Sequence, residues 1–181
     1  MSRIEWYVSP WALLIFALLY FFDSQGFYGA LLPAMAVHEL GHYLFLRYAG
    51  TPVRRISLGL FGAEMDYWGE LEGVRGFMAV AAGPIFGFAY ALCCSFGGEF
   101  WQFSGEISIL LSLFNLLPVL PLDGGRIMLM AAGERGNTIS RGISIVLTGA
   151  ALGFWLLEGW ISPLAMSLWL LWCNIGEKSK E

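Results

Sequence analysis

The sequence has few charged residues for its length. Only 13% of its 181 residues are Asp, Glu, Lys or Arg, whereas 57% are hydrophobic. A soluble domain usually carries about 25% charged residues, and here the apolar residues form long runs. These features predict an integral membrane protein, and the length leaves room for one membrane-embedded domain over residues 1–181.

Basic runs and a cysteine framework are also missing. The net charge is −4 and no cluster of Lys and Arg is present, so nothing indicates a nucleic-acid partner. The three cysteines, Cys93, Cys94 and Cys173, all lie in apolar runs. An odd number of cysteines in such positions argues against disulfides and favours small packing residues.

Six apolar segments are long enough, or nearly so, to cross a bilayer. They cover residues 6–22, 27–47, 74–96, 107–132, 139–157 and 160–175. The first lacks a small-residue cleavage site, which favours a retained anchor over a signal peptide. The fourth is interrupted by "PVLPLDGG". The expected fold is therefore an all-α polytopic membrane protein of about six transmembrane helices, the fourth of them broken.

The distribution of charge supports this count. With the N-terminus inside, the outer loops carry Asp23, Glu99, Glu106 and Glu158, and every Lys and Arg falls on the inner side. This is the positive-inside pattern. It predicts a multi-pass protein with both termini in the cytoplasm.

Residues 51–73, "TPVRRISLGLFGAEMDYWGELEG", are too polar to span a membrane. Apolar residues alternate on either side of Gly62, which is typical of a short hairpin. We therefore expect a membrane-associated β-hairpin at about residues 53–67, on the inner side.

The sequence has only two histidines, and both lie in the second apolar segment, within "HELGH" at residues 38–42. Residues four apart share one face of a helix, so His38 and His42 can bind one ion. His-Glu-x-x-His is the zinc-binding pattern of many metallopeptidases, with the glutamate as general base. The alternative, two packing histidines, does not explain why ionisable residues lie inside an apolar segment, where they are costly.

A catalytic zinc site needs a third protein ligand, and Asp123 in "NLLPVLPLDGGR" is the candidate. Pro118 and Pro121 cannot continue a helix because proline has no amide proton. Irregular backbone at membrane depth is tolerated only inside protein or beside a wet cavity. The alternative is a helix kink in which Asp123 caps the next helix.

Together, "HELGH" and "NLLPVLPLDGG" resemble the motifs of the site-two protease family of intramembrane zinc metalloproteases. The chain is most similar to the small six-span branch that includes the enzymes processing sporulation sigma factors. "AAGPIFGF" resembles the family's Gly-Pro motif, but Gly87 stands where that motif usually has asparagine. The core of the resemblance covers residues 27–132. PDZ and CBS domains, which family members often add, are not expected here.

The resemblance implies a function and a set of roles. One Zn²⁺ per chain would be bound by His38, His42 and Asp123, with Glu39 as the catalytic base. Asn115 matches an asparagine proposed to contact substrate or the oxyanion, although it could instead bond another helix. The implied activity is regulated intramembrane proteolysis of membrane-protein substrates in a prokaryotic plasma membrane. The hairpin would present an extended substrate.

Two other interpretations remain open from the residues alone. One is a membrane metallopeptidase whose zinc domain faces the cytosol and takes its third ligand from Glu64, Asp66, Glu70 or Glu72. The other is a metal transporter, since transporters also use broken helices at the midplane. The first leaves Asp123 without a role, and the second leaves Glu39 without one.

Overall fold

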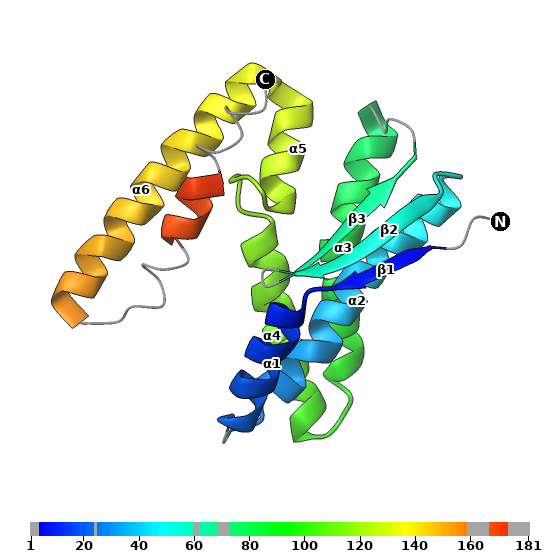
Figure 1. The fold of residues 1–181 in the computed structure, drawn as a ribbon, viewed down its shortest axis with the longest axis vertical. Helices are drawn as coiled ribbons and strands as arrows, with labels where there is room; N and C mark the ends of the chain where they lie inside the picture. The colour runs from blue at the N-terminus through cyan, green and yellow to red at the C-terminus, as the bar shows by residue number, and fades with distance from the viewer. Residues whose placement is uncertain (1–3, 24, 60–61, 69–72, 159–166, 174–181) are drawn as a thin grey trace. The chain divides into compact units, whose positions relative to one another are not determined.

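The computed structural model describes residues 4–23, 25–59, 62–68, 73–158 and 167–173. The chain divides into two compact units, Met1–Leu113 and Phe114–Glu181, and each is described by itself. Figure 1 labels the elements, with β1 to β3 and α1 to α3 in the first unit and α5 and α6 in the second.

The first apolar segment is not a single membrane-length helix. Residues Glu5–Val8 form strand β1, and helix α1 begins only at Pro10 and ends at Phe21. Proline favours the first position of a helix and extends the residue before it, which is why Ser9 has φ −64° and ψ 125°. The 12 residues of α1 reach about 18 Å, well short of a hydrocarbon core of about 30 Å.

The expected hairpin is confirmed, but it belongs to a larger sheet. Strands β2 (Val53–Gly59) and β3 (Gly62–Tyr67) are antiparallel, with an irregularity between Val53 and Arg55. Strand β1 pairs with β2 in parallel, so the order is β1-β2-β3. Sequence analysis missed β1 because a short apolar run such as "WYV" also fits the start of a helix. Strand β2 is therefore interior, and the edges of this sheet are β1 and β3.

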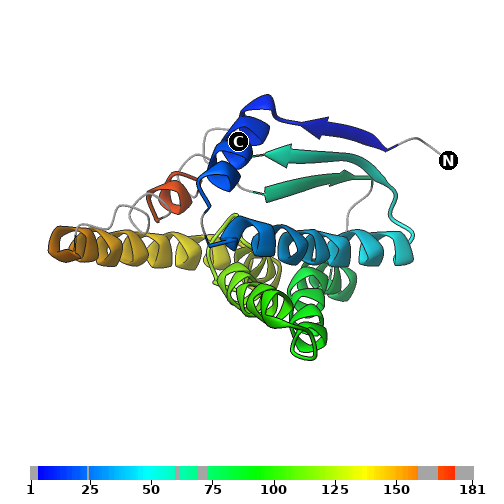
Figure 2. The same cartoon turned by 90° about the horizontal axis from the view of Figure 1, so that it is seen from below.

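Three helices complete the first unit: α2 (Phe27–Tyr48), α3 (Gly73–Cys94) and α4 (Glu99–Asn115), whose last two residues open the second unit. In Figure 2 the sheet covers one side of α2, while α3 and α4 lie on the other. Leu46, Val53, Ile56 and Ala79 form a buried cluster that joins α2, the sheet and α3.

Helix α4 begins eight residues before the expected segment, because "EFWQFSGE" is helical and not part of a loop.

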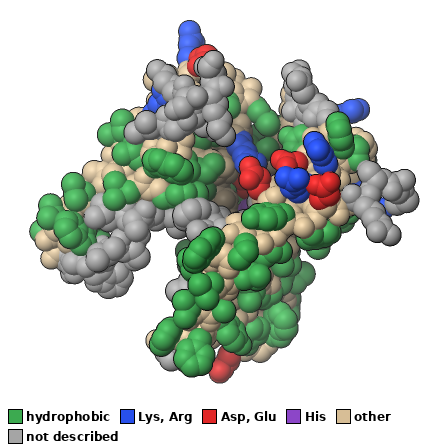
Figure 3. Space-filling model, viewed as in Figure 1, with side chains coloured by type: hydrophobic (Ala, Val, Ile, Leu, Met, Phe, Trp, Pro, Cys, Tyr) green, Lys and Arg blue, Asp and Glu red, His purple; other side chains and the backbone are tan. Residues whose placement is uncertain are grey.

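Large apolar side chains are exposed along the helices of the first unit. They include Leu14, Phe21, Ile85 and Leu110, and Figure 3 shows hydrophobic side chains over the helical end of this unit with charged ones near the sheet. Water-facing surfaces rarely carry apolar patches of this extent, whereas lipid-facing surfaces do. Among the described residues, two helices are long and apolar enough to cross a membrane, Gly73–Cys94 and Glu134–Leu157.

The second unit contains the expected helix break. Residues 116–122 are irregular, α5 (Asp123–Ala132) follows, and α6 (Glu134–Glu158) comes after Gly133, whose φ is +54°. The Leu120–Pro121 peptide bond is cis. Val119, Leu122 and Leu170 form the buried cluster of this unit.

The expected six spans are only partly reproduced. The second, third and fifth segments are helices close to the expected bounds, and the fourth is broken as expected. Most of the sixth segment lies outside the described residues, although residues 167–173 are helical. The protein is thus mainly helical with a small sheet, and a count of six membrane spans is not established.

Candidate metal centre

The two histidines lie on one face of α2 and converge. The Nε2 atoms of His38 and His42 are 3.3 Å apart, and the ring centroids are 5.0 Å apart. His38 is only 4% exposed. Two imidazole nitrogens this close, on residues one helical turn apart, can bind a single ion.

The neighbouring helix α3 fixes which nitrogen of His42 is available. The Nδ1 atom of His42 lies 2.9 Å from the carbonyl oxygen of Ala79, a residue of α3. A carbonyl oxygen only accepts hydrogen bonds, so Nδ1 carries the proton and donates it. The lone pair is then on Nε2, the atom that faces His38. Metal-binding histidines are commonly oriented by such a bond from the other ring nitrogen.

Gly83 forms the wall of α3 beside this pair. A Cβ at Gly83 would fall onto His42 Nε2 and would lie 2.8 Å from His38 Nε2. Gly41, inside the "HELGH" motif, is equally constrained, because its Cβ would lie 2.5 Å from the Ala82 carbonyl oxygen. Small residues allow helices to approach closely in membranes. These two glycines therefore bring the backbone of α3 to the histidine nitrogens.

The structure also shows what stands at the position of the family asparagine. A Cβ at Gly87 would fall onto the Oγ atom of Ser112, on α4. The polar atom beside α3 at this level is therefore a serine hydroxyl from another helix. Sequence reasoning could not find this contact, because nothing in the sequence pairs residue 87 with residue 112.

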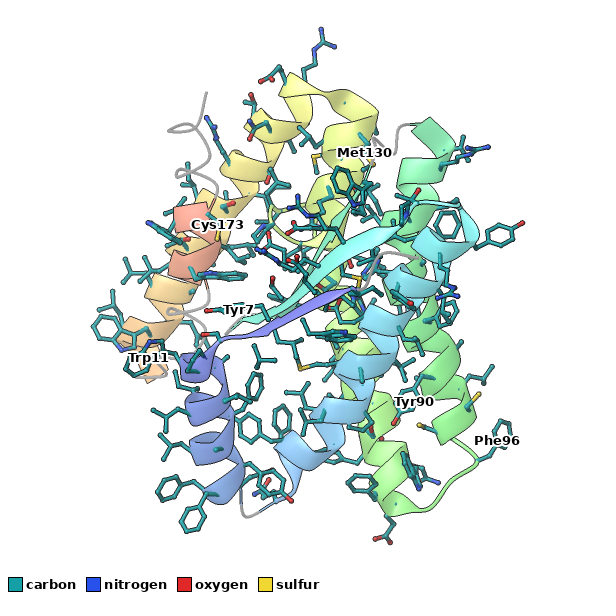
Figure 4. The ribbon with its side chains drawn as sticks, turned by 45° about the vertical axis from the view of Figure 1, so that its right-hand side comes forward. Tyr7, Trp11, Tyr90, Phe96, Met130 and Cys173 are labelled. Atoms are coloured by element: carbon teal, nitrogen blue, oxygen red, sulfur yellow. The ribbon has the colours of Figure 1, made fainter. Side chains whose placement is uncertain are left out.

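Helices α3 and α4 are joined by further hydroxyl groups. Ser104 Oγ donates to the Ala30 carbonyl oxygen at 2.7 Å, and Tyr90 Oη lies 2.9 Å from Ser104 Oγ. Because the Ser104 proton goes to Ala30, Tyr90 is the donor in the second bond. Figure 4 shows Tyr90 among these helices, while Phe96 projects outward where α3 ends. These hydroxyl groups join α2, α3 and α4, the helices that include the histidine pair and the wall beside it.

Glu39 lies on α2 next to His38 and is half-buried. Consecutive residues on a helix point in directions about 100° apart, so the carboxylate of Glu39 leaves the helix beside the histidines rather than between them. This is the placement expected of a base that acts near a metal without ligating it.

Asp123 and Asn115 lie in the second unit. Asp123 is the first residue of α5 and is 7% exposed, and the amino end of a helix favours a negative charge. Gly124 and Gly125 follow because a Cβ at either position would overlap the backbone of residues 116–120. Asn115 is the last residue of α4 and is half-buried. The irregular segment between them thus packs directly against the start of α5.

The donor set fits a divalent zinc ion. The convergence of two Nε2 atoms, one of them fixed by the Ala79 carbonyl, is the arrangement that zinc requires of its imidazole ligands. Asp123 is a carboxylate of the type that completes such sites. The chain has no further histidine to compete for this role.

Comparisons with known proteins agree with this chemistry. The family model "Peptidase family M50" matches residues 96–157, which include Asn115 and Asp123. A protein named putative zinc metalloprotease Rip3, from Mycobacterium tuberculosis, is 30% identical over 78% of this chain and 40% of its own length. Putative zinc metalloprotease sll0528, from Synechocystis, is 31% identical over 90% of this chain and 42% of its own length.

The fold is also shared with a solved structure. The site-2 protease from Methanocaldococcus jannaschii superimposes with a TM-score of 0.70 at 22% identity, covering 98% of this chain and 92% of that one. The chain spans about 40% of the length of the two curated relatives. The matches and the "HELGH" and "NLLPVLPLDGG" motifs together show that the chain belongs to peptidase family M50, the family of the site-two proteases.

Proposed function

We propose that the protein is an intramembrane zinc metalloprotease that hydrolyses peptide bonds in or near transmembrane segments of membrane proteins. The observation that carries this proposal is the histidine pair on α2, whose Nε2 atoms are 3.3 Å apart and whose His42 ring is oriented by the Ala79 carbonyl. Its family membership supports the same activity. A single metalloprotease domain over residues 1–181 would contain both units.

His38, His42 and Asp123 are the three protein ligands in this proposal, with one zinc per chain. A catalytic zinc site has three protein ligands and leaves a position open. Asp123 is supported by its burial and by its place at the amino end of α5, after a proline-rich break. Zinc, when bound, supplies a Lewis acid that polarises the scissile carbonyl and makes water more acidic.

Glu39 acts as the general base and then as the general acid. Its carboxylate takes a proton from the attacking water and transfers it to the nitrogen of the leaving amine. Asn115 donates its side-chain amide to the substrate carbonyl oxygen as negative charge develops there. Its half-buried position at the end of α4 leaves part of the side chain accessible.

The protein resides in the membrane in this proposal, with both termini in the cytoplasm of a prokaryote. The apolar exposed surface and the helices Gly73–Cys94 and Glu134–Leu157 support membrane insertion. The orientation rests on the one-sided distribution of Lys and Arg. Cysteines introduced at Gln102 and Ser57 test it, because the first should react with an impermeant reagent from outside and the second only from inside.

An extended substrate is held at the outer edge of β3. A helical substrate hides its carbonyl groups in its own hydrogen bonds, so it must unwind before cleavage. If the unwound substrate adds as a strand to an edge of the sheet, its backbone amides and carbonyls form hydrogen bonds with that edge. Because β2 is paired on both sides, proline at Ser57 or Leu58 would break the sheet itself. Of the two hairpin strands, β3 is therefore the one that offers an edge to substrate.

Prolines at Glu64 and Met65 test this edge. Successive amides along a strand point to opposite sides, so one substitution removes an amide directed at β2 and the other an amide directed outward. The variant that loses the outward-directed amide should cleave more slowly than the parent but keep its zinc content and thermal stability. The variant that loses the amide directed at β2 should have a lower thermal stability. Equal, parent-like cleavage by both variants would remove β3 from substrate binding.

The central experiment compares the purified protein with Glu39→Gln. The substrate is a single-span protein with helix-breaking residues near its cleavage site, in detergent or bilayers. Glu39→Gln should keep about one zinc per chain and lose about 10²–10⁴-fold in cleavage rate. A zinc-loaded parent that never cleaves, but moves zinc across vesicles, would support a transporter instead.

A further inference from the structure

Three serines lie one helical turn apart on the buried face of α4, and one of them differs from the others. Ser104, Ser108 and Ser112 are all 0% exposed. Ser104 Oγ donates to the Ala30 carbonyl oxygen, and Ser108 Oγ donates to the Gly87 carbonyl oxygen at 2.9 Å. Within the described parts of the chain, Ser112 Oγ has no hydrogen-bond partner. A buried polar group left unsatisfied costs about 1–3 kcal/mol.

Packing does not explain this hydroxyl. A Cβ at Gly87 would fall onto Ser112 Oγ, yet it would lie 3.5 Å from Ser112 Cβ and 3.4 Å from Ser108 Oγ. These are ordinary van der Waals distances. Alanine at both positions 87 and 112 would therefore fill the same space without an unsatisfied hydroxyl. The chain instead has a glycine that makes room for a polar atom.

The hydroxyl lies on the helix face that borders the histidine pair. Gly83 and Gly87 are one turn apart on α3, about 6 Å along the helix axis. Gly83 is in contact with both histidine Nε2 atoms, and Gly87 is in contact with Ser112 Oγ. The same face of α3 thus meets the two histidines at one level and the serine hydroxyl at the next.

We propose that Ser112 is a positioning residue that holds a buried water molecule next to the histidine pair, ready for hydrolysis. This inference rests on the proposed proteolytic function. A water molecule both donates and accepts, as the hydroxyl does, and buried waters typically satisfy otherwise unpaired polar groups. Since the side chain is entirely buried, a polypeptide cannot reach it without separating α3 from α4. Each peptide bond hydrolysed consumes one water, which must be supplied inside an apolar helix bundle.

The test compares Ser112→Ala with Ser108→Ala and with the double variant Gly87→Ala, Ser112→Ala. Ser112→Ala should keep zinc and thermal stability but lower kcat about ten-fold, equivalent to about 1.4 kcal/mol, with KM unchanged. The double variant, which refills the space with a methyl group, should behave in the same way. Ser108→Ala should lower thermal stability and leave kcat close to the parent value.

Each other result counts against the proposal. Parent-like kcat in Ser112→Ala would show that the hydroxyl serves packing alone. A raised KM with unchanged kcat would show that it contacts substrate and not water. A loss of kcat in Ser112→Ala that the double variant restores would mean that the missing volume was responsible.

A readout that needs no catalysis separates this proposal from the proposed function. In Ser112→Cys, the infrared S–H stretching band should be shifted to lower frequency by hydrogen bonding, as identified in a difference spectrum against the parent. An unshifted band would overturn the bound water even if the enzyme cleaves its substrate. A shifted band with an inactive parent would keep the bound water and reject proteolysis.

Discussion

The two regions that carry the proposed ligands are built in opposite ways. Helix α2 runs without interruption through His38 and His42, and the helical repeat puts both side chains on one face, where their Nε2 atoms are 3.3 Å apart. The chain around Asp123 is irregular from residue 116 to 122, and its helix begins only at the ligand itself. A regular helix supplies two ligands at fixed spacing, whereas a break places a single carboxylate at a helix end.

The supporting contacts differ accordingly. On α2 the support includes the bond from His42 Nδ1 to the Ala79 carbonyl oxygen and the close approach of Gly83 to the histidine rings. Near Asp123, the backbone at Gly124 and Gly125 packs against the backbone of residues 116–120. In addition, Ser140 Oγ accepts a hydrogen bond from the Leu120 amide at 2.8 Å. The region around the histidines therefore depends on side-chain geometry. The region around Asp123 depends on close backbone packing and on hydrogen bonds to the backbone groups of its irregular segment.

The largest effects should come from removing the ligands. His42→Ala and Asp123→Ala should each reduce zinc content from about one per chain to near zero, since a site with two protein ligands no longer provides the set that zinc requires. Elemental analysis of purified protein measures this. Gly142→Ala, at a position on α6 with nothing within 4 Å of the added methyl, is the control. Full zinc occupancy in Asp123→Ala would show that the second unit contributes no ligand.

The next effect should come from the glycines that make room in each region. Gly83→Ala places a methyl group onto His42 Nε2, so it should lower zinc affinity strongly while leaving the thermal stability of the metal-free protein close to the parent's. Gly124→Ala places its methyl onto the Leu116 carbonyl oxygen, so it should lower both. Zinc competition titrations and thermal unfolding of metal-free protein separate the two outcomes. Equal loss of stability in both variants would remove the proposed distinction between the regions.

The sequence predicted the histidine pair well because its geometry is local. Residues 38 and 42 fall on one face of any α-helix, and an apolar helix was expected over residues 27–47, where α2 covers Phe27–Tyr48. The break before Asp123 was predictable for a similar reason, because Pro118 and Pro121 cannot continue a helix. Both features depend on residues no more than five positions apart in the sequence.

Contacts between elements were not predictable. The bond from His42 to Ala79 joins residues 37 apart in sequence, and the contact of Gly87 with Ser112 depends on how α3 and α4 pack. Strand β1 was missed because its pairing partner, β2, is about 50 residues away. Helix α4 was expected to start too late because the polar residues of "EFWQFSGE" suggested a loop, although they are compatible with an exposed first turn of a helix.

The smallest effect should come from the serine that supports the irregular segment. Ser140 is 1% exposed, and its hydroxyl accepts the Leu120 amide, one residue before the cis proline. In Ser140→Ala this buried amide loses that acceptor, which should cost about 1–3 kcal/mol of stability and raise the dissociation constant for zinc a few-fold. Ser144 is the matched control, because it is also buried on α6 but its Oγ donates, as far as the described residues show, to the Ser140 carbonyl oxygen within its own helix. Ser144→Ala should therefore leave both quantities nearly unchanged. Thermal unfolding measures the stability of the two variants, and titration with a zinc chelator measures their dissociation constants for zinc. Identical values for Ser140→Ala and Ser144→Ala would mean that the segment before Asp123 does not depend on α6 for its shape.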